Sequence, residues 1–153
     1  MNVLLVCLGN ICRSPLAEGI LRHKAKLMDL DLFVDSAGTS DWHIGEPPDS
    51  RGINVAFENG IDISNLKARQ FDLRDFDKFD LILAMDKSNY SHLLNLAENS
   101  ENSKKIKLFM NFAYPETNMD VPDPYYDNRF EEVFKLLDQT SDKILDNIIK
   151  LKS

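Results

Sequence analysis

The chain has 153 residues, of which 43% are hydrophobic, and it carries a net charge of −7. This length suits one domain with a sizeable core, so we expect residues 1–153 to form a single domain. The negative charge argues against nucleic acid or an anionic membrane as the main partner, since both attract basic surfaces.

Membrane insertion, secretion and metal binding are also disfavoured. No stretch is long enough to span a bilayer, and the apolar run at the N-terminus is too short for a signal peptide, so we expect a cytoplasmic protein. Cys7 and Cys12 lie too close in sequence to build a disulfide framework. With three scattered histidines they do not give the ligand spacing of a zinc site, so neither a metal nor another cofactor is predicted.

The first predicted element is an apolar strand over residues 2–6, followed by a loop that enters a helix. Ser14 and Pro15 suit the first turn of that helix, whose free N–H groups would form a binding site for an anion. Gly9 and Asn10 tolerate the positive φ of a tight loop whose N–H groups converge on the same anion. The segment therefore predicts an anion-binding loop.

Two residues of this loop indicate chemistry as well as binding. Arg13 supplies a planar fork that matches two phosphate oxygens. Cys7 would lie at the base of the loop, where positive potential favours the thiolate. The sequence thus predicts a nucleophile inside a phosphate-binding loop.

The next elements complete a βαβ unit. Hydrophobic residues at helical spacing predict one buried helix face, made of Leu16, Ala17, Ile20, Leu21, Leu27 and Met28. A short apolar strand over residues 32–34 ends at the run 35–39, and the crossover between the two strands should be right-handed. Glycine and proline between residues 40 and 48 predict a loop, which holds the single tryptophan, Trp42.

The rest of the chain alternates helices and strands. We predict a helix from the N-cap Asp49 to Phe57, a turn or short helix over 72–79, a strand over 80–85, a helix capped by Asp86, a strand over 105–109, a long loop that contains 119–126, and a final amphipathic helix from near Asn128. This order predicts an α/β fold of three layers, with a four-stranded parallel sheet, helices on both faces and an N-terminal phosphate-binding loop. Ligands of such sheets bind beyond the carboxyl ends of the strands, where Cys7, Ser36 and Asp86 fall.

The run from Val6 to Pro15 resembles the phosphate loop of the low-molecular-weight protein tyrosine phosphatases. The runs 35–39, 84–89 and 123–126 resemble the same family. The resemblance implies hydrolysis of phosphotyrosine in proteins, and of small aryl phosphates, through a phosphocysteine intermediate without a metal. One departure is that Leu66 and Lys67 stand where the family usually has a histidine, which affects local packing rather than the chemistry.

The resemblance also assigns roles. Cys7 would be the nucleophile, Arg13 and the loop amides would hold the equatorial oxygens, and the Ser14 hydroxyl would stabilise the returning thiolate. No residue near the loop can protonate the leaving oxygen, so the acid must come from elsewhere. Asp123, placed between two prolines, is the candidate for this acid and for the base that later activates water, with Asp120 as the alternative.

Further residues are expected to bind the substrate or to support the loop. The substrate-binding set comprises Leu8, Gly9, Asn10, Ile11, Cys12 and Ser14 of the loop, with Trp42, Tyr125 and Tyr126 as walls of a slot. A slot deep enough for a phenyl ring would favour phosphotyrosine over the shorter phosphoserine, although the tyrosines could instead only pack the loop down. By resemblance, Ser36 holds the side chain of Asn10. We expect a monomer or a weak dimer.

Several alternatives share parts of this pattern. Arsenate reductases of similar fold need further redox cysteines, which are absent after Cys12, and phosphoarginine phosphatases tend to have threonine where Ile11 stands. A thiol oxidoreductase that uses Cys7 and Cys12 would leave Arg13 and Asp123 unused, and a phosphate-binding module without catalysis is the remaining alternative. Cys12 itself is either a packed loop residue or a trap for oxidised Cys7, and the two interpretations are compatible.

Overall fold

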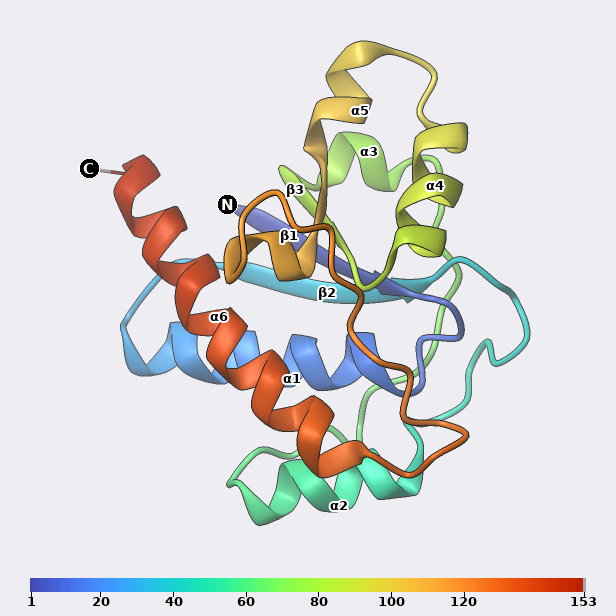
Figure 1. The fold of residues 1–153 in the computed structure, drawn as a ribbon, viewed down its shortest axis with the longest axis vertical. Helices are drawn as coiled ribbons and strands as arrows, with labels where there is room; N and C mark the ends of the chain where they lie inside the picture. Colours follow the sequence, from blue (N-terminus) through green and yellow to red (C-terminus); the bar gives the residue numbers. More distant parts are fainter. Residues whose placement is uncertain (153) are drawn as a thin grey trace.

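A four-stranded parallel sheet forms the centre of the protein, shown in Figure 1 as a computed structural model in which residues 1–152 are described. The strands are arranged in the order β2-β1-β3-β4, with bounds β1 (Asn2–Cys7), β2 (Phe33–Gly38), β3 (Leu81–Ala84) and β4 (Ile106–Leu108). The connecting helices are α1 (Arg13–Leu27), α2 (Ser50–Glu58), α3 (Asp75–Lys78), α4 (Lys87–Leu96), α5 (Ser100–Lys105), the 3-10 turn η1 (Phe109–Phe112) and α6 (Phe130–Lys152). The predicted three-layer α/β fold is confirmed.

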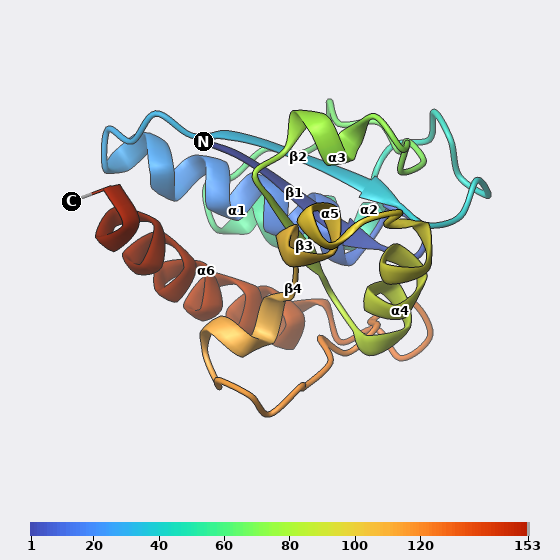
Figure 2. The same ribbon diagram turned by 90° about the horizontal axis from the view of Figure 1, so that it is seen from above.

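Alternation along the strands sends side chains into two separate cores. Val3 and Leu5 of β1 point to the side covered by α1, α2 and α6, whereas Leu4 and Val6 point to the side covered by α3 and α4. Figure 2, viewed from above, shows the two groups of helices on opposite sides of the sheet. Burial of both faces explains why β1 reads as a continuous apolar run.

The predicted buried face of α1 is too long. Leu16, Ile20 and Leu21 are fully buried, but Leu27 and Met28 are 73% and 45% exposed. The helix ends at Leu27, and Leu30 donates its backbone N–H to Ala25 as the chain turns toward β2. The apolar residues at the end of this helix are therefore largely or partly open to solvent rather than part of the core.

Other boundaries differ from the predictions for local reasons. β2 runs on to Gly38 because Leu5, Val6 and Cys7 of β1 continue to pair with it, whereas the sequence suggested a strand of three residues. Asn128 has a φ of 61°, so it cannot begin a right-handed helix, and α6 starts at Phe130. Helix α5 and η1 were not predicted, since neither is long enough to show a helical period.

The remaining features position the loop after β1. Asp49 and Asp86 cap α2 and α4 as predicted, each accepting a backbone N–H. A Cβ on Gly38 would lie 2.7 Å from the carbonyl oxygen of Leu8, so only glycine lets the end of β2 approach the loop. Among residues 1–152, no helix combines the length and the apolar character needed to cross a membrane.

Candidate active site

The loop between β1 and α1 folds around the sulfur of Cys7. The backbone N–H of Asn10 donates to Cys7 Sγ over 3.3 Å, and Ser14 Oγ lies 3.0 Å from the same sulfur. Asn10 has a φ of 58°, which turns its N–H inward. Cys7 is only 2% exposed, so its sulfur is reached through the opening of the loop alone.

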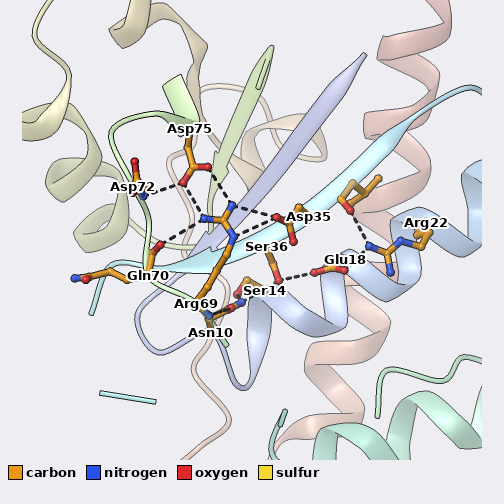
Figure 3. A network of polar contacts seen from close by, with 11 residues as sticks. Asn10, Ser14, Glu18, Arg22, Asp35, Ser36, Arg69, Gln70, Asp72 and Asp75 are labelled. Atoms are coloured by element: carbon orange, nitrogen blue, oxygen red, sulfur yellow. Dashed lines mark hydrogen bonds and ion pairs between the residues drawn. The ribbon is translucent and has the colours of Figure 1, made fainter. Parts of the chain in front are cut away.

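The side chain of Asn10 ties the loop to the sheet. Its amide nitrogen donates to Ser14 Oγ over 2.8 Å and to Ser36 Oγ over 2.9 Å. Its carbonyl oxygen accepts the backbone N–H of Arg69 over 3.0 Å. Both N–H groups and the carbonyl oxygen of this amide are thus hydrogen-bonded, and the expected contact between Ser36 and Asn10 is present (Figure 3).

Arg13 begins α1, and residues that lie far from it in the sequence hold its guanidinium in place. Its Nη1 donates to Asp86 Oδ2 over 2.8 Å and to the carbonyl oxygen of Val121 over 2.9 Å. Burial by itself lowers the pKa of the guanidinium, but the negative charges of Cys7 and Asp86 outweigh it and raise the pKa. Arg13 is therefore a permanent cation with a fixed orientation.

Asp123 lies at the mouth of the loop, next to this cation. Its Oδ2 is 3.9 Å from Arg13 Nη2, and its Oδ1 accepts the backbone N–H of Tyr125. The alternative acid, Asp120, is bound to Lys87 through both the backbone N–H and Nζ of that residue. Burial raises the pKa of Asp120, but the hydrogen bonds from Lys87 outweigh burial and lower it, so Asp120 stays ionised and is unsuited to donate a proton.

An open cleft of about 330 Å³ leads to Cys7. It is lined by Cys7, Leu8, Gly9, Ile11, Cys12, Arg13, Trp42, His43, Asp123, Tyr125 and Tyr126. A larger hollow of about 760 Å³ lies beside β4, but it contains neither cysteine nor Asp123. Ten of the thirteen predicted site residues thus line one cleft, while the side chains of Asn10, Ser14 and Ser36 are buried behind it.

The aromatic walls are more open than the sequence suggested. Trp42 is 71% exposed and Tyr126 is 88% exposed, so both form the rim of the cleft rather than enclosed walls. Tyr125 is less exposed than these two residues, at 43%. Its ring packs edge-to-face on Tyr126, with the ring centres 4.9 Å apart, and lies near the guanidinium of Arg51. The slot is therefore shallow on one side, which leaves room for a peptide around an aryl phosphate.

Two residues of the site were not predicted. His43 lines the cleft, with its ring so close to the loop that a Cβ on Gly9 would approach it to 3.0 Å. Asp86 orients Arg13, whereas the sequence indicated its role as a helix cap and its place at the edge of the sheet where ligands bind. The one signal for His43 was its position beside Trp42, and the one signal for Asp86 was its place at the carboxyl end of β3.

Cys12 differs from Cys7 in its surroundings. Both thiols are free, and Cys12 is 6% exposed. Burial, and next the negative charge of Asp49, raise the pKa of Cys12 well above its ordinary value. Cys12 is therefore a protonated thiol at neutral pH and a poor nucleophile.

This difference leads to a prediction about oxidation. Mild peroxide should oxidise Cys7 to a sulfenic acid, which the Cys12 thiol then converts to a disulfide with loss of water. A thiol reductant should restore activity to the native protein, and recovery should be clearly poorer in Cys12→Ser, because the sulfenic acid would be oxidised further. Equal recovery of phosphatase activity in both proteins would show that Cys12 only packs the loop.

The fold and the cleft together define a cysteine-dependent phosphatase: a thiol lies at the base of an anion-binding loop that leads into a helix, with a guanidinium and a carboxyl group above it. A sequence model of the low molecular weight phosphotyrosine protein phosphatases matches residues 2–153. The chain belongs to this family and is a protein tyrosine phosphatase, as its sequence predicted.

Individual relatives agree with this assignment. The low molecular weight protein-tyrosine-phosphatase YfkJ of Bacillus subtilis is 41% identical over 154 residues, covering 99% of this chain and 98% of that protein. The crystal structure of YfkJ has a TM-score of 0.94 and covers 100% of this chain and 97% of the other. A protein tyrosine phosphatase of Entamoeba histolytica, with Hepes in its active site, has a TM-score of 0.92 at 34% identity and covers 100% and 99% of the two chains.

The similar structures also include a differently named enzyme. A Drosophila arginine phosphatase has a TM-score of 0.89 at 32% identity, and the similarity covers 97% of this chain and 98% of that protein's chain.

Within the described part of the chain, no group of three or more histidine, cysteine or acidic side chains could hold a metal ion.

Proposed function

We propose that Cys7, Arg13 and Asp123 carry out phosphotyrosine hydrolysis through a phosphocysteine intermediate. The observation that supports this most strongly is that Cys7 Sγ accepts the N–H of Asn10 at the base of a cleft whose mouth holds Arg13 and Asp123. This cleft brings together a thiol, a fixed cation and a carboxyl group.

In the first step, the Cys7 thiolate attacks phosphorus, so that a sulfur–phosphorus bond forms as the bond to the phenolic oxygen breaks. The leaving oxygen takes a proton from the carboxyl group of Asp123. Arg13 and the loop N–H groups neutralise the charge on the equatorial oxygens. Asp86 and the Val121 carbonyl keep the Arg13 fork in place during this step.

In the second step, water attacks phosphorus while the Asp123 carboxylate takes its proton. The sulfur–phosphorus bond breaks, and its electron pair returns to Cys7 as thiolate. Ser14 Oγ, 3.0 Å from the sulfur, can donate to the thiolate as it leaves. Inorganic phosphate is the second product, and no metal takes part.

The cleft also supports a preference among phosphorylated substrates. We propose that the phenyl ring of phosphotyrosine passes between Leu8 and Tyr125, with Trp42 and Tyr126 contacting neighbouring residues of the substrate protein at the rim. Phosphoserine is too short to bring its phosphate to Cys7 from this rim. Ile11, a bulky apolar residue of the loop that lines the cleft, favours phosphotyrosine over phosphoarginine.

Phosphate release from peptides of one sequence tests this preference. We expect phosphotyrosyl peptide to be hydrolysed at least about 100-fold faster than phosphoseryl or phosphoarginyl peptide, comparing kcat/KM without added metal and with a chelator present. Faster release of phosphate from the phosphoarginyl peptide would contradict this preference and would instead indicate an arginine phosphatase, as the Drosophila protein is named.

We propose that residues 1–153 form one catalytic domain, since both cores flank a single sheet. We propose a cytoplasmic location, because the mechanism needs Cys7 as a free thiol beside Cys12 and such thiols stay reduced there. Phosphotyrosine-containing proteins and free oxyanions are the proposed partners of a monomer or weak dimer.

A further inference from the structure

The segment that carries Asp123 is buried at both ends and exposed between them. At one end Val121 is 1% exposed and donates its backbone N–H to the carbonyl oxygen of Met85. At the other end Phe130, which is 2% exposed, begins α6. Residues 125–129 are all exposed, and in Figure 1 this segment, drawn in orange, passes the start of α2 just before α6 begins. A contact from outside is needed to hold such a stretch in one conformation.

Arg51 of α2 makes that contact. Its Nη2 donates to the carbonyl oxygen of Tyr125 over 3.1 Å. Its guanidinium also lies 5.7 Å from the centre of the Tyr125 ring and 4.7 Å from the centre of the Phe130 ring, within the range of cation–π contacts. The other hydrogen bonds of residues 122–129 in the described structure join these residues to one another or to the first turn of α6. Arg51 therefore fixes this segment against the rest of the protein.

Arg51 is itself held in one orientation by Asp49, two residues before it. Its Nε and Nη2 donate to the two carboxylate oxygens of Asp49 over 3.0 and 2.9 Å, and its backbone N–H also donates to Asp49 Oδ1. A planar guanidinium paired in this way cannot rotate without breaking both side-chain bonds. The backbone N–H of Asp49 in turn donates to the carbonyl oxygen of Ile11 in the phosphate loop over 2.8 Å. Arg51 thus connects the phosphate loop to the segment that carries Asp123.

Tyr125 transmits this constraint to the carboxyl group of Asp123. Its backbone N–H donates to Asp123 Oδ1 over 3.1 Å, while Oδ2 lies 3.9 Å from Nη2 of Arg13. The oxygen that accepts this N–H is the unprotonated one, so in the acid form the proton is on Oδ2, the oxygen beside Arg13 at the mouth of the loop. A fixed Tyr125 therefore selects the oxygen of Asp123 that delivers the proton.

We propose that Arg51 is a positioning residue for the general acid, acting on Asp123 through Tyr125. With Arg51 in place, the N–H of Tyr125 stays on Oδ1, and the proton on Oδ2 is directed at the leaving oxygen. Without Arg51, the exposed stretch loses its contact with α2, and the carboxyl group adopts orientations from which the proton does not reach the leaving oxygen. This inference rests on the proposed role of Asp123 as the acid.

A second aspartate–arginine pair of the same geometry supplies a matched control. Arg74 donates to Asp72, two residues before it, through its backbone N–H, Nε and Nη2 over 2.8, 3.0 and 3.0 Å. Its side chain is 90% exposed, and it does not line the cleft. Arg51→Met and Arg74→Met each remove one such pair, but the contact to Tyr125 is lost in Arg51→Met alone.

The measurement is kcat/KM for phenyl phosphate and for nitrophenyl phosphate, two small substrates that offer Arg51 no peptide to bind. Phenol, like tyrosine, leaves poorly as an anion and needs the proton, whereas the more acidic nitrophenol leaves without it. We expect Arg51→Met to lower kcat/KM about tenfold for phenyl phosphate, the size expected for losing one hydrogen bond to a charged group, and less than about twofold for nitrophenyl phosphate. Arg74→Met should leave both values unchanged.

Two further variants show whether the loss passes through Asp123. Arg51→Met added to Asp123→Asn should cause little further loss with phenyl phosphate, because the proton that Arg51 helps to direct is already absent. Asp49→Asn keeps a side chain that can cap α2 but removes the charge that holds the guanidinium. It should show the same selective loss with phenyl phosphate, at a smaller size.

An equal loss for the two substrates in Arg51→Met, or a full further loss when Arg51→Met is added to Asp123→Asn, would overturn the inference and leave Arg51 as a contact that only stabilises the segment. Unchanged kcat/KM for phenyl phosphate in a folded Arg51→Met would do the same. The proposed function fails by a different result, in which Asp123→Asn itself slows both substrates equally, whatever the behaviour of the Arg51 variants.

Discussion

Replacing Cys7 with serine should abolish turnover, with a loss on the order of 10⁶-fold in kcat, as for other enzymes that lose a covalent nucleophile. The serine hydroxyl keeps the size of the thiol but is scarcely ionised at neutral pH, so it cannot attack phosphorus. The loop N–H groups and Arg13 are untouched by the change. The variant should therefore still bind phosphotyrosyl peptide and inorganic phosphate, which calorimetric titration would measure.

Cys12→Ser is the matched control for this loss. The two cysteines lie in one loop and are both buried, but only Cys7 accepts the N–H of Asn10. We expect Cys12→Ser to retain most of its activity before oxidation. Substantial turnover by Cys7→Ser, or an equal loss in both variants, would contradict the assignment of the nucleophile.

The second large effect is expected for Asp123→Asn, which keeps the shape of the side chain and removes the proton donor. Loss of a general acid typically costs about 10²–10⁴ in rate. The cost should be large for phosphotyrosine, because the phenol of tyrosine has a pKa of about 10 and leaves poorly as an anion. It should be much smaller for a nitrophenyl phosphate, whose acidic phenol leaves without a proton.

The pH profile and a neighbouring aspartate provide the controls for this prediction. The variant should lose the fall in turnover at high pH that accompanies deprotonation of the acid. Asp120→Asn should show neither effect, since Asp120 binds Lys87 and does not line the cleft. If Asp123→Asn slowed both substrates equally and kept the native pH profile, Asp123 would only shape the loop.

Much of the fold could be predicted because strands, loops and helix caps leave patterns within a few neighbouring residues of the sequence. The run of residues 2–6 and the residues of the phosphate loop gave the start of the sheet and the place of the site, since buried parallel strands are apolar throughout and anion loops need particular residue types. The capping residues Asp49 and Asp86 marked two helix starts correctly, because capping acts within three residues.

The features that could not be predicted from the sequence depend on contacts between residues that are distant in the chain. Leu27 and Met28 follow the helical period of α1, but whether they are buried depends on how far the sheet extends beneath them. The pair Arg13–Asp86 joins residues 73 positions apart, and the pair Ser36–Glu18 joins a strand to the preceding helix. Neither pair has a spacing that the periodicity of a helix or strand could reveal.

The proposed mechanism requires that phosphate passes through a covalent bond to Cys7. The most direct measurement is rapid acid quenching of the protein during hydrolysis of a phosphotyrosyl peptide, followed by proteolysis and location of the phosphate by mass spectrometry. We expect a phosphorylated peptide that contains Cys7, formed within the first turnover and absent from Cys7→Ser. Phosphate attached to another residue, or a first turnover that releases phosphate with no modified Cys7 at any quench time, would contradict the account.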